Sequence, residues 1–316
     1  MDLREAIIRT VCYFDLFDFP LTREEVRNLL YSNEASAETV AAAVALLLAG
    51  KTLSENGGLI SLADRVGLEK TRAERKVFSD RKWRRARRWA RVFAALPGVE
   101  FVGVGNTLAY DNARDGSDID FFIVTAPNAI WRTRFFCAAL AASFDLRPKN
   151  GNNRDKLCLS FFVTTEALDM SEFDCHCEER TNERRGNLAG DAPKVDIYMR
   201  YWTRQMTPLS GNQKAAELFF SKNHEVAPRE KIGRPIVWRW LCAPLGLLPG
   251  TFMRGWQQQH FPKAIVDAAA RRDGSVVISD TILKFHVSDR RADIYDRWQK
   301  RVESILYESR ETPRTN

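Results

Sequence analysis

The sequence predicts an α+β protein in which a small sheet is flanked along the chain by helical regions. Two short apolar runs, at 101–104 and 121–124, have the length and composition of buried strands. A charged segment at 65–96 has the length and periodicity of one long helix. In the regions on either side, 1–64 and 195–316, the apolar residues recur mainly at helical spacing. Strands in the middle and helices at both ends therefore define the predicted class.

Composition is that of a folded protein with a basic surface. The chain has 316 residues, of which 45% are hydrophobic and 28% charged, enough for about two or three domains. Its net charge of +7 favours acidic partners such as nucleotides, nucleic acid or an anionic lipid surface. The 6 cysteines form no disulfide framework, and the start lacks the pattern of a signal peptide. We therefore expect a cytoplasmic protein.

The first 64 residues predict three short helices followed by a hairpin, which is the order of a winged-helix-like module. The expected helices are 2–17, 22–30, opened by a capping box, and 37–49, and the hairpin is 51–62. Such a module can bind DNA through its third helix. That helix, however, has no Arg, Lys, Asn or Gln to offer a groove. A protein-contact or scaffold role is therefore the favoured interpretation.

The long helix expected at 65–97 carries a dense basic run between residues 81 and 91. The run comprises Arg81, Lys82, Arg84, Arg85, Arg87, Arg88 and Arg91, with Trp83 and Trp89 interleaved. In one interpretation the aromatic side packs on the next domain while the arginines stay in water. In the other the arginines bind the phosphates of RNA, DNA or anionic lipid. We favour the first, and nucleic-acid binding remains the alternative.

The sequence from Phe101 to Thr125 carries the main chemical signal. Gly105-Asn106 ends the first strand with a turn, and the second strand begins with Asp118-Ile119-Asp120. Successive strand residues point to opposite faces, so the two aspartates share a face while the isoleucine enters the core. Carboxylates held this close repel each other, and a bound cation removes the conflict. Magnesium or manganese, which prefer oxygen ligands, are the expected ions.

This strand–turn–strand pattern resembles the nucleotidyltransferase superfamily typified by DNA polymerase beta and the aminoglycoside nucleotidyltransferases. The wider chain also resembles a group of bacterial and archaeal proteins that carry this domain behind a winged-helix-like segment. That second likeness depends on KLCLSFFV (156–163), DIYMRYWTRQMTPL (196–209) and FFSKNHEV (219–226). The resemblance implies five segments. They are a winged-helix-like module (1–64), a connecting helix (65–97), a nucleotidyltransferase core with a mixed sheet (98–166), a polar loop (167–194) and a mainly helical C-terminal region (195–316).

The resemblance also implies a reaction, in which an NMP passes from an NTP to a hydroxyl acceptor and pyrophosphate is released. Asp118 and Asp120 would hold two metal ions about 3.5–4 Å apart. Gly105-Asn106 would steady the triphosphate through backbone N–H groups, with Asn106 in place of the usual serine. The other candidate nucleotide contacts are Ser117, Arg114, which instead could pair with a nearby aspartate, and Lys156 in the basic loop 147–156.

A third carboxylate normally completes the metal site of the superfamily, and its place here is the strand 157–164. That strand contains no acid, and Ser160 occupies its middle. Asp155, Glu166 or Asp196 could supply the missing oxygen, with Asp196 preferred. The competing hypothesis is that the domain has lost catalysis and only binds a nucleotide or nucleic acid as a regulatory module.

The remaining segments carry weaker signals. Cys175-His176-Cys177 lacks the second ligand pair of a structural zinc site, so no metal is expected there. The most apolar stretch, 235–253, is interrupted by proline and glycine, which favours buried helices over a membrane span. Contact with a membrane surface is the lesser alternative. A strand or short hairpin is expected at 276–287 and a charged amphipathic helix at 289–306.

Overall fold

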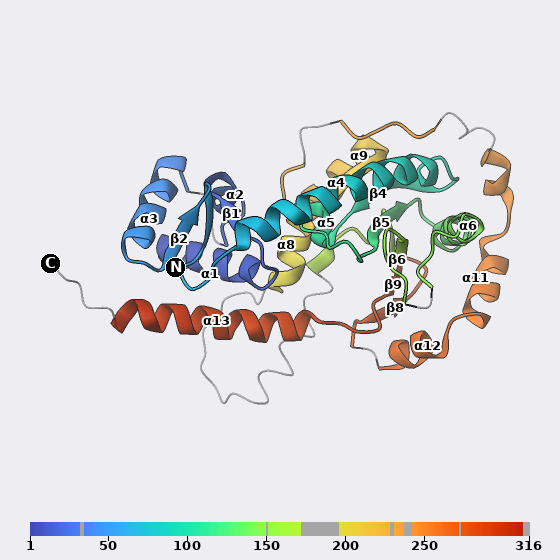
Figure 1. Cartoon of the computed structure of the whole chain (residues 1–316). Coiled ribbons are helices and arrows are strands. Elements are labelled where there is room, and N and C mark those ends of the chain that lie inside the picture. The colour runs from blue at the N-terminus through green and yellow to red at the C-terminus, as the bar shows by residue number, and fades with distance from the viewer. Residues whose placement is uncertain are drawn as a thin grey trace. The chain divides into compact units, whose positions relative to one another are not determined.

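The computed structural model has an α+β fold with two separate sheets (Figure 1). It describes the chain except for residues 32–34, 150, 172–195, 228–230, 237–241, 272 and 312–316. The described chain divides into two compact units, Met1–Val77 with Arg290–Asn316, and Phe78–Asp289. The C-terminal region expected as one segment at 195–316 is thus shared between the two units.

The first unit joins the N-terminal elements to the last helix of the chain. Its elements are α1 (Leu3–Asp15), β1 (Leu21–Thr22), α2 (Arg23–Asn28), α3 (Ala37–Ala49), β2 (Leu53–Asn56), β3 (Leu59–Leu62) and α13 (Arg291–Glu311). The three strands form an antiparallel sheet in the order β1-β3-β2. Helix α13 packs on α1, where the indole N–H of Trp298 donates to the backbone oxygen of Arg9 at 2.9 Å.

Local sequence signals explain the boundaries of these elements. Thr22 and Glu25 form the expected capping box at the start of α2, each accepting from the other's backbone N–H. Ser36 caps α3 by accepting from the backbone N–H of Thr39. Gly57 and Gly58 connect β2 to β3 with φ of 57° and 76°, the left-handed backbone that a two-residue hairpin loop requires. The predicted helices and hairpin of this region are confirmed.

The second unit is built on a mixed six-stranded sheet. Its strands are β4 (Val99–Val104), β5 (Ile119–Thr125), β6 (Leu157–Thr164), β7 (Thr207–Gly211), β8 (Val276–Ile278) and β9 (Ile282–Phe285). Their order is β7-β4-β5-β6-β9-β8, and only the β5–β6 pair is parallel. The sequence predicted all of these except β7, which contains Pro208 and ends in Gly211. An edge position tolerates both residues.

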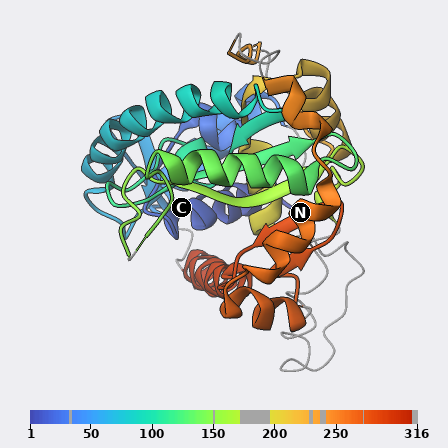
Figure 2. The same ribbon diagram turned by 90° about the vertical axis from the view of Figure 1, so that its right-hand side faces the viewer.

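Helices cover both faces of this sheet and create two hydrophobic cores. The helices are α4 (Leu68–Phe93), which begins in the first unit, α5 (Asn106–Ala109), α6 (Ile130–Ser143), α8 (Ile197–Gln205), α9 (Gln213–Lys222), α11 (Gly250–Gln259) and α12 (Lys263–Ala270). On one face α4 and α6 pack over Phe121, Ile123 and Phe162. On the other, α8 and α9 pack over Phe122 and Phe161. Figure 2 shows the ribbons of the second unit from another side.

One expectation about buried apolar residues was wrong. The stretch 235–253 was expected to form buried helices. Where it is described, it forms a short 3-10 helix, Ala243–Leu247, and the start of α11, with Leu247 and Phe252 largely exposed. Its prolines and glycines keep these elements too short to bury one continuous face. Among the described helices, none is long and apolar enough to cross a membrane.

Candidate metal-binding site

Asp118 and Asp120 lie at the start of β5, where strand alternation sorts the neighbouring side chains. Ile119 and Phe121 enter the core beneath α4 and α6, whereas Phe122 belongs to the core beneath α8 and α9. Asp120 shares the face of Phe122, because residues two apart in a strand point the same way. Asp118 directly precedes β5, and one of its carboxylate oxygens lies within 4.8 Å of one from Asp120. Both aspartates are partly buried. The expected proximity of the two carboxylates is confirmed.

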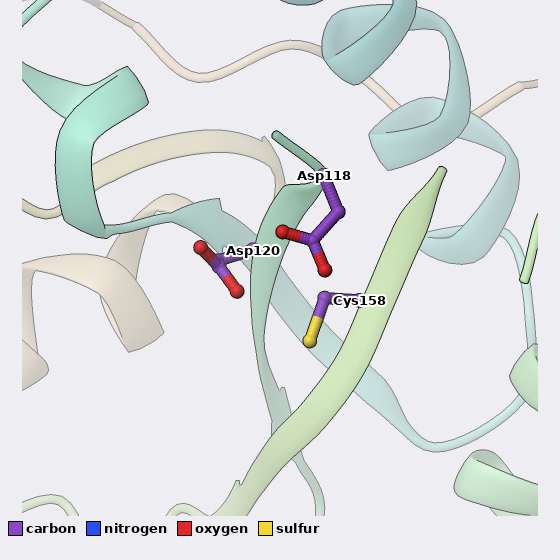
Figure 3. Close-up of side chains that lie close together, drawn as sticks. All are labelled: Asp118, Asp120 and Cys158. Carbon is purple, nitrogen blue, oxygen red and sulfur yellow. The ribbon is translucent and has the colours of Figure 1, made fainter. Parts of the chain in front are cut away.

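A thiol joins these carboxylates from the neighbouring strand. Cys158 of β6 is paired directly with Asp120 of β5 in the parallel ladder. One ligand atom from each of Asp118, Asp120 and Cys158 can be chosen so that all three atoms lie within 4.8 Å of one another (Figure 3). Within the described chain this is the group of acids, histidines and cysteines that could hold a metal ion.

A bulge in β6 shifts the register of the β5–β6 ladder directly after the Asp120–Cys158 pair. Asp120 pairs with Cys158, but Phe122 pairs with Phe161, so β6 uses one residue more than β5 over this step. Such a bulge re-aims the side chains beside it. It returns Phe161 to the face of Phe122 and so separates the polar end of the sheet from its apolar centre.

The pKa values of two members of this cluster are raised by their surroundings. Burial, and then the charge of Asp120, raise the pKa of Asp118 to about 6, although its own backbone N–H and Lys82 act in the opposite direction. Burial and the two carboxylates also raise the pKa of the Cys158 thiol well above its usual value. Each shift reflects the cost of holding negative charge in a partly desolvated place. A divalent cation at this point would remove that cost.

Lys82 on α4 fixes the loops that lead into the site. Its side chain is completely buried, and its ammonium donates to the backbone oxygens of Ser117 at 2.6 Å and Asp115 at 3.1 Å. It also pairs with the Asp155 carboxylate at 2.7 Å. Ser117 directly precedes Asp118, and Asp155 lies just ahead of β6. One lysine thus holds the entries to both strands of the site.

Arg81 reinforces the same connection, so two members of the basic run are structural. Its guanidinium pairs with Asp115 at 2.6 Å and with Asp155 at 2.9 Å. Asp155 is therefore occupied by two cations and is not part of the candidate metal group. The amphipathic interpretation of this helix is confirmed for its buried side, which also includes Lys82 of the basic run.

The turn after β4 lies next to the carboxylates. The backbone N–H of Gly105 donates to the backbone oxygen of Asp120 at 3.3 Å. A Cβ on Gly105 would lie 2.5 Å from the indole nitrogen of Trp202, so the close approach of α8 requires glycine here. Asn106, with a φ of 56°, accepts a hydrogen bond from the Tyr198 hydroxyl at 2.7 Å through its side-chain oxygen. The helix that follows, α5, spans only four residues.

The other predicted site residues are engaged elsewhere in the fold. Ser117 donates its hydroxyl to the backbone oxygen of Arg114 at 2.9 Å, and Arg114 is exposed. Lys156 pairs with Asp145 at 3.0 Å. Neither contact involves the carboxylates of Asp118 and Asp120, so the nucleotide contacts of these residues stay predictions.

Asp196, the preferred third carboxylate, caps a helix instead of joining the candidate metal group. Its side chain accepts from the backbone N–H groups of Tyr198 at 2.8 Å and Met199 at 3.2 Å at the start of α8. Glu166 follows the far end of β6, eight positions beyond Cys158. The third place beside the aspartates belongs to Cys158.

Sequence reasoning missed Cys158 and the polar pair behind it. The Cys158 thiol donates to the Ser160 hydroxyl at 3.2 Å, and that hydroxyl lies 3.0 Å from Nε2 of His286. Ser160 and His286 are 126 residues apart, so nothing in the sequence predicts that they meet. Cys158 and Ser160 could have been noticed, because they are the polar residues that alternate with apolar ones at the start of the predicted strand. The Cys175-His176-Cys177 segment lies outside the described residues.

Comparisons with protein-family models, with curated proteins and with solved structures found no match to this chain. The fold and the site therefore define the protein as an α+β protein that presents two carboxylates and a thiol at the end of a mixed sheet.

Proposed function

We propose that the protein is a metal-dependent nucleotidyltransferase that moves an NMP from an NTP to a hydroxyl acceptor. One observation carries the proposal. The carboxylates of Asp118 and Asp120 lie close together at the start of β5, next to the Gly105-Asn106 turn that ends the antiparallel neighbour β4. The order of strand, turn, short helix, loop and second strand is the one expected from the resembled superfamily. The mixed sheet around it is compatible with that assignment.

In this proposal each element at the site has a separate task. Asp118, Asp120 and Cys158 would hold a divalent cation, which supplies charge neutralisation for the phosphates and for the attacking hydroxyl. The Gly105-Asn106 turn would position the triphosphate, and Tyr198 holds the Asn106 side chain in place. The acceptor oxygen bonds to the α-phosphorus as the bond to the β-phosphate oxygen breaks. Pyrophosphate leaves, and the hydroxyl proton passes to water.

The N-terminal elements support a winged-helix-like module as part of the proposal. The order α1-β1-α2-α3-β2-β3 with a three-stranded sheet is the order such a module has. The exposed side of α3 carries Ala41, Ala42, Ala45, Leu46 and Ala49. This surface suits contact with another protein better than contact with DNA phosphates.

Transfer of label from an α-phosphate-labelled NTP into cell extract tests the transferase. The wild-type chain should label an acceptor only with a divalent cation present. Asp118→Asn with Asp120→Asn removes both charges at nearly constant shape and should abolish labelling. Asp267→Asn, an exposed acid on α12, is the matched control and should label normally. Equal labelling by the double variant and the wild type would refute the assignment.

A second candidate, a catalytically inactive nucleic-acid-binding module, is favoured by one surface. Arg84, Arg87, Arg88 and Arg91 are exposed on α4 at positions i, i+3, i+4 and i+7, so they form one basic stripe. Within the described residues no acidic side chain pairs with any of them. Arg87 lies over the ring of Trp83, with 5.4 Å between its guanidinium carbon and the ring centre. Four arginines on one helix face suit a run of backbone phosphates.

A further inference from the structure

The donor set at the end of β5 is not the all-oxygen set that magnesium prefers. Magnesium takes oxygen ligands in near-octahedral geometry, whereas thiolates favour zinc and chemically related ions. Here the third donor beside Asp118 and Asp120 is the sulfur of Cys158. The two carboxylates fit magnesium or manganese, and the thiol does not.

The backbone makes Cys158 a fixed member of the group. Direct pairing with Asp120 on adjacent parallel strands places both side chains on one face at the spacing of neighbouring strands. The bulge that follows confines this pairing to the polar end of the sheet. One oxygen of each carboxylate lies within 4.8 Å of the sulfur, so a single ion can reach all three donors.

Polar partners behind the thiol orient it further. Ser160 accepts the thiol hydrogen at 3.2 Å, and His286 contacts the Ser160 hydroxyl at 3.0 Å. Metal ligands in proteins are commonly oriented by such outer hydrogen bonds, and losing them costs about 10–100-fold in affinity. Ser160 could keep a hydrogen bond to the sulfur after the thiol loses its proton, by donating its own hydroxyl hydrogen.

We propose that Asp118, Asp120 and Cys158 form a site for a thiophilic divalent cation of the zinc type, in preference to magnesium. Three protein ligands with the remaining coordination position open is the arrangement of catalytic zinc sites. The open position would take a phosphate or acceptor oxygen. This inference rests on the proposed function for what the cation does, but not for whether the cation binds.

Cadmium is the probe that reports the sulfur directly, through the ultraviolet charge-transfer band of a cadmium–thiolate bond. The full-length metal-free protein is titrated with cadmium and then with zinc or magnesium as competitor. The band should appear in the wild type, disappear when zinc is added and persist in a large excess of magnesium. The control variant Cys175→Ser with Cys177→Ser removes two other thiols, which lie outside the described residues, and it should keep the band.

Two substitutions at one position separate ligation from folding. Cys158→Ser should lose the band and bind zinc on the order of 100-fold more weakly, the upper end of what loss of an outer hydrogen bond already costs. Cys158→Asp supplies a carboxylate at the same place, so it should lose the band and bind magnesium more tightly than the wild type. Circular dichroism should match the wild type for both, and thermal unfolding should match it for Cys158→Ser.

Several outcomes would overturn the inference. They are an unchanged band in Cys158→Ser, loss of the band in the Cys175/Cys177 variant alone, and displacement of cadmium by magnesium at equal concentration. The proposed transferase fails separately: a cadmium band assigned to Cys158 without any nucleotide transfer leaves the metal site intact and refutes the reaction. Magnesium-supported transfer that is identical in the wild type and Cys158→Ser would support the reaction and refute the thiol-containing metal site.

Discussion

The ammonium of Lys82 lies 2.6 Å from the backbone oxygen of Ser117, the residue directly before Asp118. A helix residue far from the carboxylates in sequence thus sets the position at which β5 begins. The same ammonium pairs with Asp155 ahead of β6. Asp118 directly precedes β5, Asp120 belongs to it and Cys158 belongs to β6, so the alignment of the candidate metal group depends on this buried contact.

Replacing Lys82 should therefore damage both stability and metal binding. Lys82→Met leaves Asp155 without one of its cations and two carbonyl oxygens without a donor, which should lower the free energy of unfolding by about 3–5 kcal/mol. Urea titration measures this loss. Arg84→Met, on the exposed side of the same helix, should change it by less than about 0.5 kcal/mol. Equal effects of the two substitutions would contradict the structural role of Lys82.

Asp118 should make the metal-free protein less stable as the pH rises. Its pKa is about 6 in the folded chain against an ordinary value of 3.8, so between these values the folded chain binds more protons than the unfolded chain. The contribution of this carboxyl to stability is complete below about pH 4 and is lost as the pH rises through about 6.

The measurement is urea unfolding in the presence of a chelator at pH 4.5, 6 and 7.5. Asp118→Asn should remove most of the decline and be more stable than the wild type at the highest pH. Added divalent cation should then stabilise the wild type and leave the variant unchanged. If the wild type instead becomes more stable relative to Asp118→Asn as the pH rises, the Asp118 carboxylate is not destabilised by its surroundings.

Gly105 should tolerate no side chain, because α8 closes over the turn. In Gly105→Ala the new Cβ would lie 2.5 Å from the Trp202 indole nitrogen, and relieving that overlap should cost about 1–3 kcal/mol. Gly116→Ala is the matched control in the same region, since nothing lies within 4 Å of its Cβ position. Thermal unfolding should rank Gly105→Ala well below both the control and the wild type. A normal melting temperature would mean that α8 does not approach the turn.

The basic stripe predicts salt-dependent binding of single-stranded RNA or DNA oligonucleotides. Replacing Arg84, Arg87, Arg88 and Arg91 by Gln should weaken binding and lower the slope of log affinity against log salt by about 3, since each phosphate contact adds about 0.7 for a single strand. The charge-matched control replaces four exposed lysines elsewhere by Gln: Lys51, Lys70, Lys214 and Lys263. Equal losses in both variants would show that only net charge matters. Binding to anionic vesicles but not to oligonucleotides would assign the stripe to a membrane surface.

The two carboxylates could be predicted from the sequence because strand alternation is a local property. Cys158 could not be placed, since its position beside Asp120 depends on the register of two strands whose paired residues are far apart in the chain. Lys82 was open to prediction, however. It falls on the helix face that also carries Trp83, Ala86 and Phe93, so its burial could be read from the periodicity.

Asp196 shows the opposite limit of sequence reasoning. An acid directly before a helix suits both a metal ligand and a helix cap, and local sequence does not separate the two roles. The structure assigns its side chain to the backbone N–H groups of Tyr198 and Met199. Edge strand β7 was missed for a similar reason. A proline such as Pro208 is compatible both with the end of a helix and with an edge strand, and local sequence does not separate the two.

The most direct test of the account is a crystal structure with manganese and a non-hydrolysable NTP analogue, read by anomalous scattering. Manganese is chosen because its anomalous signal locates the ion and because the two carboxylates offer the oxygen donors that it prefers. We expect an anomalous peak between the Asp118 and Asp120 carboxylates, in contact with the triphosphate, with the phosphates beside the Gly105-Asn106 turn. An analogue bound elsewhere, with no ion between these two carboxylates, would contradict it.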